Sequence, residues 1–112
     1  MQTATDILDV LEKWAEEKMP VDPGAYLDAA LKLAALMGNE ADKLYLMEQN
    51  VAKTRVEYLQ GGMTSAAAKV HIEASDEYRA CRTQKSLLNR IEETIRLSKA
   101  RSRLAIEEKR SQ

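Results

Sequence analysis

Cysteine, proline, glycine and aromatic residues are all scarce in this 112-residue chain, and each scarcity excludes a class of structure. Cys81 is the single cysteine, so no intrachain disulfide can form and a cytosolic setting is expected. Phenylalanine is absent and aromatic residues make up only 4% of the chain. This argues against a sheet protein, because aromatic and β-branched residues accumulate in strands.

Long apolar runs are also missing from the sequence. No stretch of 18 or more apolar residues occurs, so we expect no membrane span. The first residues, MQTATDILDV, lack the basic start and the apolar run of a secretory signal peptide. The sequence therefore predicts a protein that remains in the cytoplasm, where it is made.

The residue types that dominate the chain all favour helix: Ala, Leu, Glu, Lys, Arg, Gln and Met. Capping and breaking signals divide the chain, with Thr5 or Asp6 as the first cap, Pro20 as a stop and Asp22-Pro23 as a restart. Gly38 is expected to close one helix, and Gly61-Gly62 to separate the last two. The predicted helices cover residues 5–19, 23–37, 39–60 and 64–108.

These elements predict a single all-α domain over residues 1–112. The expected arrangement is a helical hairpin with one long C-terminal helix plus two short N-terminal helices and coiled-coil-like packing. No glycine or proline follows Gly62, so nothing in the sequence interrupts the last helix. Apolar residues thin out beyond Lys99, and we expect residues 100–112 to fray unless a partner covers them.

The last predicted helix carries an apolar stripe at alternating spacings of three and four residues, close to a coiled-coil repeat. A helix of about forty residues is roughly 60 Å long, which exceeds a small core. The stripe is therefore either covered by the first two helices or free to meet a partner. The sequence predicts a homo-oligomer, with an unknown protein as a further partner. The stripe includes Ala67, Val70, Ala74, Tyr78, Cys81, Lys85, Leu88, Ile91 and Ile95, and the residues expected to mediate self-association are Tyr78, Cys81, Leu88, Ile91 and Ile95.

Charge is divided unevenly along the chain. Residues 1–78 hold 14 acids and 7 bases, a net charge of −7, whereas residues 79–112 hold 4 acids and 10 bases, a net of +6. Three interpretations stay open: neutralisation within the chain, assembly between chains, and phosphate binding. The bases do not share one helix face, and no aromatic residue follows Tyr78 to stack on bases. The candidate nucleic-acid-binding residues are Arg90, Arg96, Lys99, Arg101 and Arg103.

The sequence offers no recognisable catalytic or metal-binding motif. His71 is the only histidine and lacks ligands at suitable spacing, so we expect no metal. Cys81 lies on the apolar stripe, where packing explains it better than nucleophilic catalysis. Glu16-Glu17, Glu92-Glu93 and Glu107-Glu108 are adjacent pairs whose side chains diverge by about 100°. These patterns predict a protein that is not an enzyme and needs no cofactor.

Several segments resemble small helical proteins encoded by tailed bacteriophages. They are AKVHIEASDEYRACRTQ and IEETIRLSK within residues 68–99, together with DPGAYLDAALKL and EQNVA upstream. The most distinctive pieces are Glu77-Tyr78-Arg79 and Ile95-Arg96-Leu97-Ser98-Lys99. The resemblance implies a phage or prophage origin, a bacterial host cell, and a setting among recombination, replication or assembly genes. It implies no catalytic residue.

These observations lead to three functional hypotheses. The first is a non-enzymatic interaction or adaptor protein, accessory to phage DNA metabolism or assembly. The second is a nucleic-acid-binding protein that uses the basic C-terminal helix. The third is an inhibitor of a host defence protein, in which the acidic N-terminal helices imitate nucleic acid; residues 1–50 hold 10 acids and 4 bases.

Overall fold

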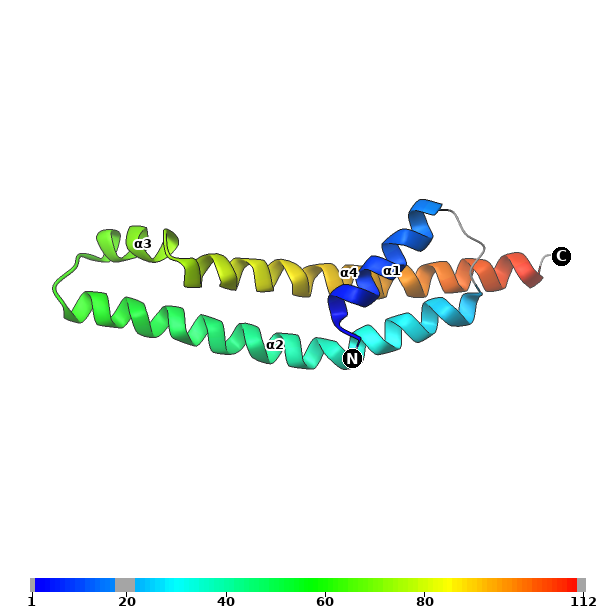
Figure 1. Cartoon of the computed structure of the whole chain (residues 1–112), viewed down its shortest axis with the longest axis horizontal. Coiled ribbons are helices and arrows are strands. Elements are labelled where there is room, and N and C mark those ends of the chain that lie inside the picture. The colour runs from blue at the N-terminus through cyan, green and yellow to red at the C-terminus, as the bar shows by residue number, and fades with distance from the viewer. Residues whose placement is uncertain (1, 18–21, 111–112) are drawn as a thin grey trace. The chain divides into compact units, whose positions relative to one another are not determined.

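The computed structural model describes residues 2–17 and 22–110, and this part of the chain is all-α (Figure 1). Its four helices are α1 (Ala4–Glu17), α2 (Pro23–Gln60), α3 (Ser65–Glu73) and α4 (Asp76–Arg110). No strand occurs within the described residues. The predicted fold class is therefore confirmed, although the helix boundaries differ from those expected at several places. None of the described helices is both long enough and apolar enough to cross a membrane.

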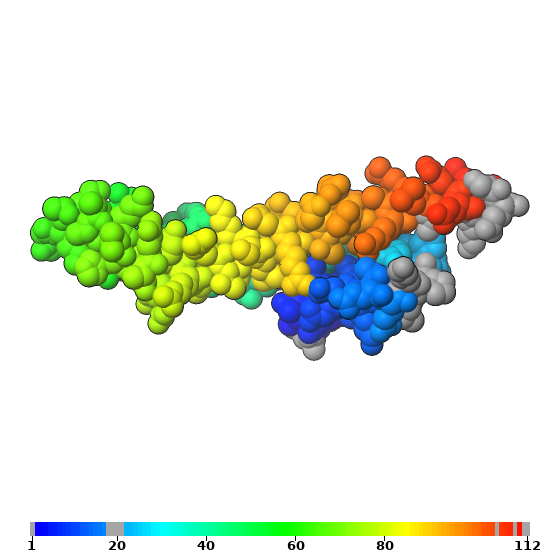
Figure 2. Space-filling view, turned by 90° about the horizontal axis from the view of Figure 1, so that it is seen from above, coloured from blue at the N-terminus to red at the C-terminus, as the bar shows by residue number. Residues whose placement is uncertain are grey.

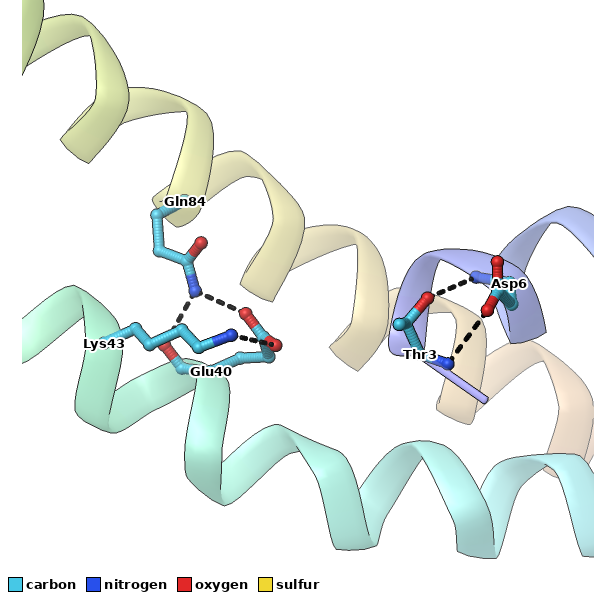
Figure 3. Close-up of polar contacts among 5 residues, drawn as sticks. All are labelled: Thr3, Asp6, Glu40, Lys43 and Gln84. Atoms are coloured by element: carbon cyan, nitrogen blue, oxygen red, sulfur yellow. Dashed lines mark hydrogen bonds and ion pairs between the residues drawn. The ribbon is translucent and has the colours of Figure 1, made fainter. Parts of the chain in front are cut away.

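Helix α1 begins at Ala4, one residue before the predicted start at residue 5, because Thr3 rather than Thr5 or Asp6 is its cap. The Asp6 amide donates to Thr3 Oγ1 at 3.2 Å, and the Thr3 amide donates to Asp6 Oδ2 at 3.0 Å (Figure 3). This reciprocal pair satisfies two backbone donors that the first turn leaves open. The hydrogen bond from the Thr3 amide lowers the pKa of the Asp6 carboxyl. The expected end of this helix at residue 19 lies outside the described residues.

Gly38 does not end a helix, so the prediction of separate helices at 23–37 and 39–60 was wrong. Helix α2 runs through both ranges over 38 residues. Gly62 is the only described glycine with a positive φ, 97°, and it makes the turn that follows α2. A glycine inside a helix costs about 1 kcal/mol relative to alanine, and the good helix formers on both sides outweigh that cost. The start at Pro23 agrees with the sequence pattern.

The predicted continuous helix over 64–108 is interrupted at Ala74 and Ser75. Ser75 Oγ donates to the Ile72 carbonyl at 2.6 Å and accepts from the Tyr78 amide at 3.2 Å. One hydroxyl thus satisfies a carbonyl at the end of α3 and an amide at the start of α4. The break also changes which residues of α3 are buried. Val70, expected on the apolar stripe, is 67% exposed, whereas Ala68 and Ile72 are buried.

The described residues fall into two compact units, and the first comprises those within 1–38 and 89–112. Its core includes Ile7, Leu8 and Leu11 of α1, Ala29, Ala30 and Leu33 of α2, and Ile91 of α4. The rings of Trp14 and Tyr26 meet edge to face, with centroids 5.7 Å apart. Figure 2 shows the side chains of α1 against those of the second half of α4.

Helix α4 continues to Arg110, past residue 100, where fraying was expected. Ser98 and Ser102 are each only 2% exposed, and Ser102 Oγ donates to the Pro23 carbonyl at 3.2 Å. Small residues at these two positions let this part of α4 pack closely within the first unit. Packing inside the chain therefore covers Ser98 and Ser102, whereas Leu104 and Ile106 further along the same helix stay exposed. Residues 111–112 lie outside the described residues.

The second unit comprises residues 39–88. Its most buried polar side chain, Gln84 of α4, donates through Nε2 to the Glu40 carbonyl at 2.9 Å and to Glu40 Oε2 at 2.7 Å (Figure 3). Lys43 lies 3.2 Å from the same carboxylate. The Gln84 hydrogen bond, with a smaller contribution from Lys43, lowers the pKa of Glu40 below its ordinary value of 4.5. Gln84 thus ties α4 to α2 through a charged acceptor.

Replacing Gln84 by alanine is expected to lower the free energy of unfolding at pH 7 by about 1–2 kcal/mol. Because the folded pKa of Glu40 is depressed, its stabilising contribution is present above about pH 4.5 and is lost as the pH falls through the folded value. The difference between variant and wild type should therefore shrink from pH 7 to pH 3, as measured by urea denaturation. Gln60→Ala, at an exposed position, is the control. A difference that is constant with pH would contradict the role of the Glu40 carboxylate.

Candidate interaction surface

The structure separates the five residues predicted to mediate self-association. Ile91 has no exposed surface and Leu88 is 9% exposed, so the chain itself covers both. Tyr78, Cys81 and Ile95 are half-buried. The prediction that Leu88 and Ile91 form an interface between chains loses its basis, because a residue in the core of its own chain offers no surface to a second one.

The five predicted nucleic-acid-binding residues also divide into two groups. Arg90 Nη2 lies 3.0 Å from Glu12 Oε2 and 4.0 Å from Asp9 Oδ1, both on α1. Arg96 forms an ion pair with Glu93, which lowers the pKa of Glu93 and raises that of Arg96. Lys99, Arg101 and Arg103 are exposed, and no ion pair joins them to any described residue. Neutralisation within the chain thus accounts for Arg90 and Arg96 only.

Helix α2 carries a second apolar stripe, which the sequence analysis missed. Tyr45 is 60% exposed, Val56 is 51% exposed and Leu59 is 40% exposed. Ala41 and Ala52 are exposed as well. At 3.6 residues per turn, these five residues lie within about 40° of the direction of Tyr45. We call this set, Ala41, Tyr45, Ala52, Val56 and Leu59, the α2 apolar face.

The α2 apolar face is distinct from the side of α2 that packs within the second unit. Four residues on that packed side are half-buried: Leu44, Met47, Val51 and Tyr58. Those residues point about 100–160° away from the direction of Tyr45. The sequence signal for this face was the helical spacing of positions 41, 45, 52, 56 and 59. Core positions of the same helix lie between them in the sequence, which hides that spacing.

A groove borders the α2 apolar face within the second unit. It has a volume of about 340 Å³ and includes Ala52, a member of the face. Its charged lining is balanced, with two acids and two bases, and its floor is apolar. The lining residues are Glu48, Val51, Ala52, Arg55, Lys69, Ile72, Glu73 and Tyr78. A mixed lining of this kind suits a protein surface better than a single charged ligand.

The remaining residues with reactive side chains are dispersed over the described structure. His71 is exposed and its ring packs edge-on to that of Tyr58, with centroids 6.1 Å apart. Cys81 is a free, half-buried thiol. No group of three or more His, Cys, Asp or Glu side chains within the described residues is arranged to hold a metal ion.

Comparison with known proteins gives no relative from which a function can be transferred. No family model matches the chain, and neither a curated protein nor a solved structure matches it. The resemblance to tailed-phage proteins stays a prediction from the sequence. Any functional proposal for this chain therefore depends on its own surface.

Proposed function

We propose that this chain is a non-enzymatic helical interaction protein that binds protein through the α2 apolar face. The observation that supports this proposal is the exposure of Tyr45, Val56 and Leu59 along one side of one helix. Single apolar residues scattered over a surface are normal, but aligned ones suit a partner helix or groove. Small residues at Ala41 and Ala52 would let a partner backbone approach closely. The phage resemblance would place such a module in DNA metabolism or assembly.

A charge placed on the α2 apolar face should abolish partner binding. Val56→Glu places a carboxylate on an exposed position, so the free chain can fold with this charge in water. A partner that covered the face would have to desolvate the charge, at a cost of several kcal/mol. A photo-crosslinking amino acid at Gln49, between Tyr45 and Ala52, would capture bound proteins in cells. We expect the crosslinked species to disappear in Val56→Glu.

The matched control is Leu104→Glu on α4, where the leucine is 59% exposed and belongs to the first unit. It should leave the crosslinked species unchanged. A crosslinking pattern at Gln49 that is identical in wild type, Val56→Glu and Leu104→Glu would contradict the proposal.

A second candidate function, nucleic-acid binding, is favoured by one observation. Lys99, Arg101 and Arg103 are exposed and have no ion-pair partner among the described residues. Free bases of this kind can replace the counterions of a phosphate backbone. The candidate site is smaller than the sequence suggested, because Arg90 and Arg96 are already paired.

Replacing Lys99, Arg101 and Arg103 together by glutamine should weaken DNA binding and reduce its dependence on salt. If each residue contacts one phosphate, the slope of log K against log salt should fall by about 3 for duplex DNA. Fluorescence anisotropy with a labelled duplex at several salt concentrations measures this slope. Arg79→Gln with Arg82→Gln is the control. An unchanged slope, or no binding by the wild type at low salt, would contradict this second function.

A further inference from the structure

We propose that the α2 apolar face binds a second copy of this chain, with the two α2 helices antiparallel. This inference deepens the proposed function by naming the partner, and it concerns only residues 41–59 of the second unit. It replaces the self-association surface expected on the last helix with one on α2. The charges that flank the face on its two sides favour this partner and this orientation.

Asp42 and Lys53 lie on one side of the α2 apolar face, and Glu48 and Arg55 lie on the other. From the direction of Tyr45, helical geometry places the first pair at about +60° and +80° and the second pair at about −60° and −80°. All four side chains are exposed. Each flank thus carries one acid and one base, separated by 11 residues on the first flank and by 7 on the second.

None of these four charges is paired within the described part of the chain. The recorded ion pairs on α2 join Lys32 to Asp28 and Lys43 to Glu40. Arg55 donates only a long hydrogen bond, 3.4 Å, to the Ser65 hydroxyl. Asp42, Glu48 and Lys53 have no recorded partner. Charges that border an exposed apolar face without internal partners are available to a second molecule.

The order of these charges selects an antiparallel partner. A two-fold axis that relates antiparallel helices places each flank against the same flank of the second copy. With this axis near Gln49, Asp42 lies on the side of the second copy's Lys53, and Glu48 on the side of its Arg55. Two-fold symmetry repeats both pairs, so four attractive pairs form. They outnumber the one close like-charge contact, between Glu48 and the second copy's Glu48, which lie about 3 Å apart along the helix axis. Tyr45 then lies near the second copy's Val56, and the alanines of the face allow close approach.

A parallel pair of helices would have the opposite electrostatics. Parallel two-fold packing places one flank against the other flank of the second copy. Lys53 would then lie only about 3 Å along the helix axis from the second copy's Arg55, and symmetry repeats this repulsion along the other edge. Asp42 and Lys53 would lie about 9 Å and 7.5 Å from its Glu48, so these two weaker contributions of opposite sign nearly cancel. Like charges across an interface exclude the wrong arrangement more strongly than attractive pairs favour the right one. The same four residues therefore define both the partner and its direction.

The rest of the surrounding surface is compatible with this arrangement. Lys69 and Glu73 of α3 line the groove beside Glu48 and Arg55, and they add one charge of each sign. Gln49 Nε2 donates to the Tyr45 hydroxyl at 2.7 Å, which satisfies a polar group in the middle of the face. The face therefore offers an apolar centre with a polar, charge-complementary rim, as protein interfaces do.

Sedimentation equilibrium of the full chain, with single and double charge variants, tests the proposal. The wild type should form a dimer. Lys53→Glu should raise the dimer dissociation constant about tenfold or more, because symmetry converts two attractive pairs into two repulsive ones. Asp42→Lys combined with Lys53→Asp should restore the wild-type value. The same pattern is expected for Glu48→Arg alone and for Glu48→Arg with Arg55→Glu. Lys85→Glu, at an exposed position on α4, is the control for a general effect of charge.

The contrary outcomes are distinct from one another. Tighter association of Lys53→Glu would indicate the parallel arrangement and overturn the direction. A wild-type dimer insensitive to both Lys53→Glu and Val56→Glu would show that another surface is used. A wild type that is monomeric at high micromolar concentration would overturn self-association. A monomeric wild type would not contradict the proposed function if crosslinking at Gln49 still captures a different protein and Val56→Glu abolishes that crosslink. Circular dichroism of each exposed-site variant should match the wild type, which separates loss of binding from loss of folding.

Discussion

Replacing Ile91 by alanine is expected to lower the free energy of unfolding by about 2–5 kcal/mol. Ile91 has no exposed surface, and it belongs to a core that also contains Leu8 and Leu33, each almost fully buried. Removing its outer carbons forfeits their transfer free energy and leaves a cavity that the surrounding helices fill only in part. Domains of this size are stable by about 5–15 kcal/mol, so this single change removes a large share of the total.

A matched control for Ile91→Ala exists on the same helix. Ile106 is 40% exposed, and Ile106→Ala should change the free energy of unfolding by no more than about 0.5 kcal/mol. Urea denaturation followed by circular dichroism measures both variants. Equal destabilisation by Ile91→Ala and Ile106→Ala would show that the core of the first unit does not include Ile91.

Replacing Ala68 by leucine should destabilise the second unit by about 1–3 kcal/mol. Ala68 of α3 has no exposed surface, so nothing larger than its methyl group fits without displacing its neighbours. Leucine is at least as apolar as alanine and nearly as good a helix former, and both of these properties would favour the variant in an open position. Only the lack of room opposes it, which makes this substitution a direct test of packing.

Ala66→Leu, two residues away on the same helix, is the control because Ala66 is exposed. Its stability should stay within about 0.5 kcal/mol of the wild type. Hydrogen exchange of α3 amides, together with thermal denaturation, would measure both substitutions. If Ala68→Leu proved as stable as Ala66→Leu, α3 would not be packed as described.

Local signals in the sequence predicted the helical class and several helix ends. Pro23 begins α2, Thr64 caps α3 through a hydrogen bond from the Ala67 amide at 3.2 Å, and Gly61-Gly62 follow α2. Each of these ends depends on a residue whose own backbone or side chain determines the local geometry. Signals of this kind can be read without knowledge of the tertiary structure.

Gly38 and Ser75 show where such reading fails. A glycine can end a helix or be carried within one, and its neighbours decide which occurs. A serine in a run of helix formers gives no warning of a break, yet Ser75 makes both capping hydrogen bonds. In each case the outcome depends on which alternative packs better, and single-residue preferences contain no information on packing.

The sequence predicted that an apolar helix face would serve as the candidate surface, but not which helix carries that face. An apolar stripe on a long helix was recognised, but whether its own chain covers that stripe is a tertiary question, and Ile91 proved to be covered. The stripe with Tyr45 and Val56 was overlooked because core residues such as Leu44 and Met47 alternate with it on the same helix. A helix with two apolar sides has a weak overall periodicity, and only the structure shows which side is occupied.

The interruption at Ser75 gives α4 a helix N-terminus of its own, and with it an electric dipole that begins at Asp76. The aligned peptide groups place about half a positive charge at that end and half a negative charge at the other. Asp76 and Glu77 lie in the first turn, while Arg101, Arg103 and Arg110 follow towards the last. The uneven distribution of charge along the chain thus matches the polarity of this helix. Asp76 and Glu77 at one end and Arg110 at the other therefore stabilise α4 itself, by about 0.3–1 kcal/mol each at low salt. Arg101 and Arg103 lie more than a turn from the end of the helix, beyond the reach of this effect.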